Sequence, residues 1–67
     1  MDSIKKFREL RGLSRIELAQ LSGVNVETIA RYERGDREPR ISVLNTIANV
    51  LACTPNDLLG VEDKEGA

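Results

Sequence analysis

Three charged residues spaced four and three positions apart are the side chains best suited to specific polar contacts: Glu27, Arg31 and Arg34. If this segment is a helix that buries Ile29, a rotation of about 100° per residue places all three roughly 140° to 160° away from the buried side chain. An outward arginine can donate two hydrogen bonds to O6 and N7 of guanine, and a glutamate can accept one from N4 of cytosine. The spacing therefore favours a helix whose outer face contacts base edges.

The helix that would carry these residues is one of five that the sequence predicts, and together they indicate an all-α fold. Glycines at positions 12, 23, 35 and 60 and prolines at 39 and 55 separate segments with the spacing of amphipathic helices. We expect these helices over residues 3–11, 14–22, 25–34, 42–51 and 54–59. The expected N-caps are Ser14, Asn25, Ser42 and Thr54, with Glu17 and Asp57 completing two capping boxes. The expected inward residues of the first two helices are Ile4, Phe7, Leu10, Leu18 and Leu21.

The second and third expected helices meet at a glycine-centred turn, as in a helix-turn-helix whose second helix enters a groove. Ala19 must be small because the following helix crosses close to it, and Gly23 must accept a positive φ in the turn. Leu18, Val24 and Ile29 are expected to fix the angle between the two helices.

Several motifs extend this pattern along the chain: FRELRGLS, ELAQ, GVNVETI, YERG, and later Pro39 and IANVLACTPNDLL. They recur in this order with the spacings typical of one family, and over residues 3–59 the chain resembles the phage-repressor and Cro-like helix-turn-helix family of transcriptional regulators. The resemblance implies a compact, five-helix, lambda-repressor-like DNA-binding domain that is dimeric on near-palindromic operators. Two positions depart from the family pattern. Arg15 stands where glutamine is common, and Ser22 stands where an apolar residue is common.

Within this motif we favour a base contact for Arg31, whereas for Glu27 a base contact and a surface pair with Arg31 stay equally open. Val26 and Thr28 lie near the start of the same helix, where Val26 could pack on a thymine methyl group. Cations and helix N-termini around the groove would bind phosphates. The expected phosphate contacts are Arg15, Asn25, Arg34, Arg37 and Arg40. Asn25 could instead serve only as a cap, and each arginine only as a solvated charge, an alternative that stays equally open for Arg37 and Arg40.

Glu33 falls on the inner side of the third helix, where an unpaired carboxylate would lose much of its hydration energy. The family resemblance implies a structural ion pair between Glu33 and Arg8, which joins the first and third helices. Cys53 stands where the family has a small apolar residue, and we expect it in the core rather than as a redox sensor.

Composition excludes several other classes of protein. The chain has 67 residues, one cysteine and no histidine, so it is one small domain without a disulfide or a zinc site built from His and Cys. It has no histidine base and no phosphate-binding glycine loop, so we expect no enzyme, no cofactor and no small-molecule ligand. Apolar runs reach only about four residues, and the first ten residues are charged where a secretory signal would be apolar. We therefore expect a cytoplasmic protein with no membrane segment.

The net charge of -1 conceals an uneven distribution. Residues 1–40 carry nine Lys or Arg and seven acids, whereas residues 41–67 carry one lysine and four acids. This asymmetry fits a nucleic-acid face in a helix-turn-helix domain over residues 1–60 and a flexible acidic tail over residues 61–67.

These observations predict a sequence-specific regulator of transcription that binds double-stranded DNA and acts as a repressor. The alternative is an antitoxin or another protein-interaction module with the same fold, in which the outer face of the third helix would be apolar. A homodimer is expected, because a core of this size is marginally stable and operators of the family are two-fold symmetric. The candidate interface residues are Leu51, Pro55, Asn56, Leu59 and Val61.

Overall fold

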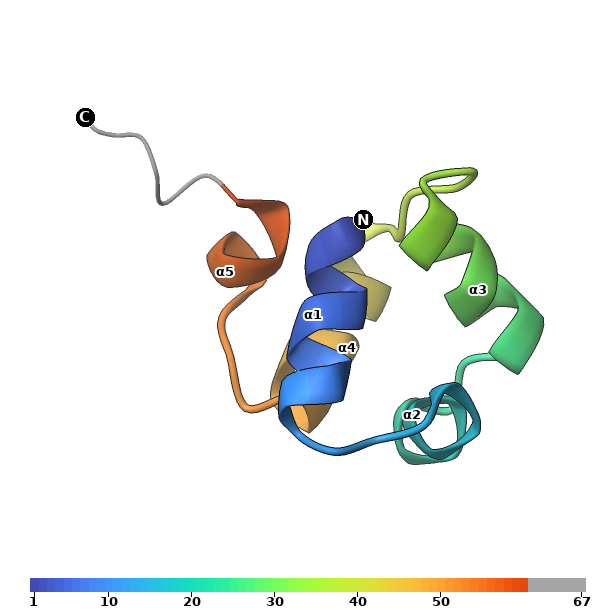
Figure 1. Ribbon diagram of the computed structural model, residues 1–67. Helices are drawn as coiled ribbons and strands as arrows, with labels where there is room; N and C mark the ends of the chain where they lie inside the picture. The colour runs from blue at the N-terminus through green and yellow to red at the C-terminus, as the bar shows by residue number, and fades with distance from the viewer. Residues whose placement is uncertain (61–67) are drawn as a thin grey trace.

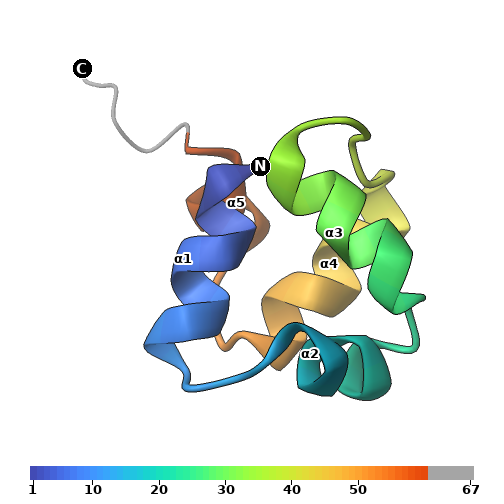
Figure 2. The same ribbon diagram turned by 45° about the vertical axis from the view of Figure 1, so that its right-hand side comes forward.

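The structure, a computed structural model, describes residues 1–60, which form five helices and no strand (Figure 1). The helices are α1 (Asp2–Leu10), α2 (Arg15–Ser22), α3 (Val26–Arg34), α4 (Ile41–Val50) and α5 (Pro55–Leu59). Helix α1 packs against α3 and α5, and α4 packs against α2 and α5, while α2 and α3 contact each other directly (Figure 2). The expected all-α architecture is confirmed.

Two capping boxes set the starts of α2 and α5 as the sequence predicts. The hydroxyl of Ser14 accepts a hydrogen bond from the Glu17 amide at 3.0 Å, and the Ser14 amide donates to the Glu17 carboxylate at 2.7 Å. These bonds lower the pKa of the Glu17 carboxyl. Thr54 and Asp57 make the equivalent pair of bonds at 3.1 and 3.0 Å, with proline at the first position of α5.

Helix α4 begins earlier than expected, so the prediction of Ser42 as its N-cap was wrong. Arg40 is the N-cap residue, without a side-chain capping bond, and Ser42 lies in the first turn. Arg40 follows Pro39 in an extended conformation, and its carbonyl oxygen accepts from the Leu44 amide at 2.9 Å. The helix therefore starts before Ser42, and a serine inside the first turn cannot occupy the N-cap position.

The core draws on all five helices. Its members are Ile4, Leu18, Ala19, Ile29, Tyr32, Leu44, Ile47, Ala48, Leu51 and Leu58. The predicted burial of Leu10 and Leu21 was wrong, since these side chains are 69% and 62% exposed. In α1 the inward face runs through Ile4 and Arg8, and in α2 it is centred between Leu18 and Ala19. Each exposed leucine is rotated about 100° or more from that face.

No helix among residues 1–60 is long and apolar enough to cross a membrane.

Cys53 lies partly buried against the core, as its expected role requires. Burial, aided by the charge of Asp57, raises the pKa of its thiol, and Arg11 only partly opposes this effect. The thiolate fraction at pH 8 is therefore smaller than in an unfolded chain. We expect iodoacetamide to alkylate the folded protein several-fold more slowly than the protein in guanidinium chloride, as followed by mass spectrometry. Equal rates would place the thiol in solvent.

Candidate nucleic-acid interface

The turn between α2 and α3 fixes the geometry of the site. Gly23 ends α2 with φ at 73°, a conformation that favours glycine, and its amide donates to Ala19 at 2.9 Å. Ser22, at the position where the family resemblance implied an apolar residue, donates its hydroxyl to the Leu18 carbonyl at 2.7 Å and accepts from the Val24 amide at 3.3 Å. The polar side chain is thus satisfied within the turn.

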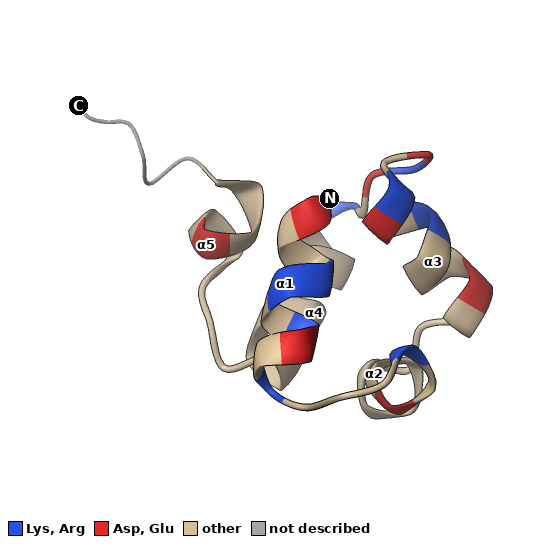
Figure 3. Ribbon diagram, viewed as in Figure 1, with Lys and Arg blue, Asp and Glu red and all other residues tan. Residues whose placement is uncertain are grey.

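Helix α3 presents one polar face to solvent, as the helical projection predicts. Val26, Glu27, Arg31 and Arg34 are exposed and Thr28 is half-buried, whereas Ile29, Ala30, Tyr32 and Glu33 are buried. Figure 3 shows an acidic position near the start of α3 and basic positions towards its end. Among the ion pairs formed within residues 1–60, none joins Glu27 to Arg31. Both side chains are therefore available to a ligand.

Asn25 caps α3 through its side-chain oxygen. Its Oδ1 atom accepts from the amide of Glu27 at 2.8 Å, so the predicted capping role is confirmed. The Nδ2 group of the same amide is a separate donor and is not needed for the cap.

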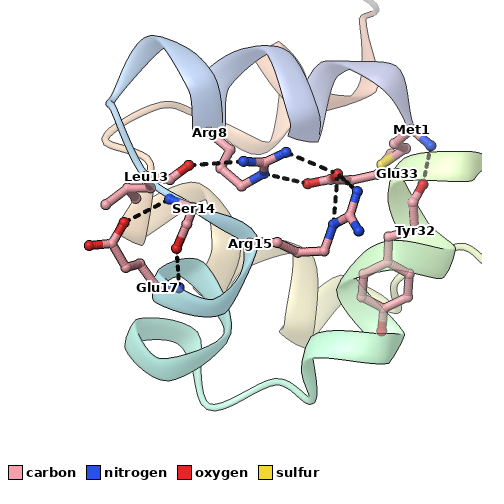
Figure 4. Close-up of polar contacts among 8 residues, drawn as sticks. All are labelled: Met1, Arg8, Leu13, Ser14, Arg15, Glu17, Tyr32 and Glu33. Carbon is pink, nitrogen blue, oxygen red and sulfur yellow. Dashed lines mark hydrogen bonds and ion pairs between the residues drawn. The ribbon is translucent and has the colours of Figure 1, made fainter.

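A buried ion pair connects α1 to α3, as the family resemblance implied (Figure 4). Arg8 Nε donates to Glu33 Oε2 at 2.7 Å, and Arg8 Nη2 donates to Oε1 at 3.3 Å. A third donor, Nη1, reaches the carbonyl of Leu13 at 2.9 Å. The hydrogen bonds to Glu33 raise the pKa of the Arg8 guanidinium, although desolvation opposes them. The pair therefore connects α3 to α1 through two hydrogen bonds of the Arg8 guanidinium to Glu33, and a third bond joins the same guanidinium to the Leu13 carbonyl.

Arg15 also binds Glu33, a contact that the sequence reasoning missed. Its Nε and Nη2 atoms lie 3.3 and 3.2 Å from Glu33 Oε1 (Figure 4). The Arg15 side chain is 44% exposed, whereas that of Glu33 is 2% exposed. The two residues lie on different helices, so their separation along the chain gives no signal of the contact.

The remaining predicted phosphate ligands surround the end of α3. Arg34 Nε pairs with Asp36 Oδ2 at 2.9 Å, but both side chains are more than half exposed, so the pair is weak and readily exchanged. Arg37 and Arg40 are exposed in the loop that follows. These three cations therefore remain open to solvent or to a ligand.

The predicted dimer residues do not form one surface, because Leu51 is fully buried in the core. Leu51 extends the apolar stripe of α4, and its carbonyl accepts a 2.7 Å bond from Arg11. The prediction that Leu51 contributes to a dimer contact was therefore wrong. Pro55 is half-buried, while Asn56 and Leu59 are exposed. Val61 and the predicted tail at residues 61–67 lie outside the described residues.

The fold and this surface together define a helix-turn-helix domain of the DNA-binding type. The family model described as Helix-turn-helix, of the Cro/C1 type, matches residues 4–58, and the chain belongs to this family, whose fold is lambda-repressor-like. The chain is 31% identical over 55 residues to YazB of Bacillus subtilis, an uncharacterized HTH-type transcriptional regulator, covering 82% of this chain and 80% of YazB. It is 36% identical over 62 residues to an uncharacterized HTH-type transcriptional regulator of Archaeoglobus fulgidus, covering 92% and 89% of the two chains. The protein is a DNA-binding regulator of transcription.

Proposed function

We propose that this protein is a sequence-specific repressor that places α3 in the major groove of double-stranded DNA. The observation that carries the proposal is the exposed face of α3, on which Glu27 and Arg31 are accessible and form no ion pair with each other. Arg31 would donate to a guanine and Glu27 would accept from a cytosine, with Val26 and Thr28 beside them. The buried pair of Arg8 and Glu33 supports this assignment, since it holds α3 rigidly.

Phosphate contacts are proposed for the residues that flank this face. Asn25 would use its free Nδ2 group at the start of α3, and the exposed arginines at the two ends of the site would supply charge. These arginines are Arg15, Arg34, Arg37 and Arg40.

The salt dependence of binding tests this proposal. We expect affinity for duplex DNA to fall steeply with salt despite the net charge of -1, because local arginines displace counterions from DNA. Arg40→Ala should make the slope of log K against log salt shallower by about one unit per subunit, with sequence preference unchanged. Lys6→Ala is the matched control. Arg8 faces α3, and Lys6 lies on α1 about 160° around the helix from Arg8, on the side away from α3. A wild-type slope near zero would refute DNA binding.

We propose that the regulator is a homodimer on a near-palindromic operator, with contacts from Pro55, Asn56, Leu59 and Val61. The exposure of Leu59, at 50%, supports a contact at this end of the molecule. Two symmetric half-sites would then lie about 34 Å apart. Sedimentation of the protein on selected DNA should give two subunits per site, and one subunit on a non-palindromic footprint would contradict the dimer.

The alternative function, an antitoxin or another protein-interaction module, draws support from a different surface. Ile16 and Leu21 on α2 are 60% and 62% exposed, and Ile16 borders an open hollow between α2 and the start of α3. Selection from a random pool of duplexes discriminates the two functions, because a pure interaction module would enrich no sequence.

A further inference from the structure

We infer that Glu33 is a positioning residue for DNA binding, which holds the Arg15 guanidinium at the start of α2 so that its free N–H groups bind a phosphate. The inference rests on the proposed DNA-binding function and deepens it. It assigns Glu33 a second role beyond its ion pair with Arg8, and it explains how Arg15 can replace a neutral residue at this position.

The first step is the difference in exposure within the ion-pair cluster formed by Glu33, Arg8 and Arg15. The side chains of Glu33, Arg8 and Arg15 are 2%, 9% and 44% exposed. Arg8 binds both carboxylate oxygens, whereas Arg15 approaches only Oε1, from the outer side. Only the Arg15 guanidinium can therefore meet a ligand.

The second step is the charge of the cluster. Two guanidinium groups share one carboxylate, so the three side chains carry a net charge of about +1 at neutral pH. One guanidinium, that of Arg8 at 2.7 Å, is enough to compensate the buried charge of Glu33. The surplus positive charge lies on the exposed member, Arg15.

The third step is the donor inventory of Arg15. A guanidinium has five N–H donors in a rigid fork. Glu33 takes the Nε donor and one Nη2 donor, so the Nη1 group and the second Nη2 hydrogen stay free. A phosphate accepts such donors in pairs. Arg15 is also the first residue of α2, the end of the helix at which backbone N–H groups favour an anion.

The consequence is a preorganised contact. An arginine held by Glu33 loses less conformational freedom on binding than a free side chain does. A purely structural Arg15 behaves differently, since a phosphate would have to pull it away from Glu33.

Arg15→Lys separates positioning from charge. Lysine keeps the positive charge but cannot reproduce the two-donor contact with Glu33. We expect the affinity for the selected operator duplex to fall about three- to tenfold, with the salt slope and the thermal midpoint nearly unchanged. Arg15→Ala should also flatten the slope by about one unit per subunit. Binding of Arg15→Lys at wild-type affinity would overturn the inference.

A double-mutant cycle and an NMR measurement complete the test. In a Glu33→Gln background, Arg15→Lys should cost less than about twofold, because the positioning carboxylate is gone. Where that background is too unstable to bind, the Nε–H resonance of Arg15 in the wild-type protein decides. It should be protected from exchange with water both free and on DNA, and loss of protection in the complex would overturn the inference. If wild-type protein binds no duplex, the proposed function fails instead.

Discussion

Glu33→Gln is expected to lower the free energy of unfolding by about 3 kcal/mol, the largest effect of any single substitution considered for this fold. The carboxylate is the only acidic partner of Arg8 among the described residues, and Arg8 is 8% exposed. Removing it leaves a guanidinium that is poorly solvated and unpaired, which typically costs several kcal/mol. Urea denaturation, with the midpoint and slope fitted together, measures the loss.

Substitution of the partner residue, Arg8, should lower the free energy of unfolding by less, because Glu33 also pairs with a second arginine, Arg15. Arg8→Met leaves the carboxylate in contact with Arg15 at 3.2 Å, so we expect a loss of about 2 kcal/mol. The double variant should lose less than the sum of the two single losses, since it removes both charges and leaves neither of them buried without its partner. Strictly additive losses would show that the two side chains do not interact. Arg34→Met is the control, because its partner Asp36 is exposed and the loss should stay below about 1 kcal/mol.

Local chemistry made the starts of α2 and α5 predictable from sequence, whereas the start of α4 was not. A hydroxyl and a carboxyl three residues apart satisfy each other's backbone groups wherever a helix starts, so Ser14 with Glu17 and Thr54 with Asp57 behave as expected. Leu10 and Leu21 failed because periodicity gives the spacing of a stripe, but its centre depends on which neighbours pack against it. In α1 the inward face includes a charged residue, Arg8, which a search for apolar residues alone passes over in favour of Leu10.

In the candidate site, too, features within one helix were predictable from sequence and contacts between helices were not. The outer face of α3 follows from rotation about one helix axis, so the sequence predicts its exposed residues correctly. Contacts between helices do not follow from rotation alone. Arg15 reaches Glu33 across 18 positions of chain, and Arg11 reaches the carbonyl groups of Leu51 and Ala52 across about 40. Leu51 is the C-cap of α4, and Ala52, the next residue, has a positive φ of 57°.

Glu27→Gln should change which base pair the protein prefers. The substitution keeps the size and helix propensity of the side chain but removes its charge. A carboxylate near phosphates opposes binding, and accepting a hydrogen bond from cytosine N4 is the specific contact that offsets this cost. The absence of a Glu27 to Arg31 ion pair among residues 1–60 favours this role over that of a surface partner.

Selection of bound duplexes from a random pool, for wild type and variant in parallel, gives the result directly. If Glu27 contacts cytosine, the glutamine variant should bind non-specific DNA more tightly and shift its preference at one base pair in each half-site towards adenine, by about 1 to 3 kcal/mol of discrimination. Arg31→Ala should instead relax the preference at a neighbouring guanine. If Glu27→Gln strengthens binding uniformly, with every preference unchanged, Glu27 makes no base contact, and discrimination must come from Arg31, Val26 and Thr28.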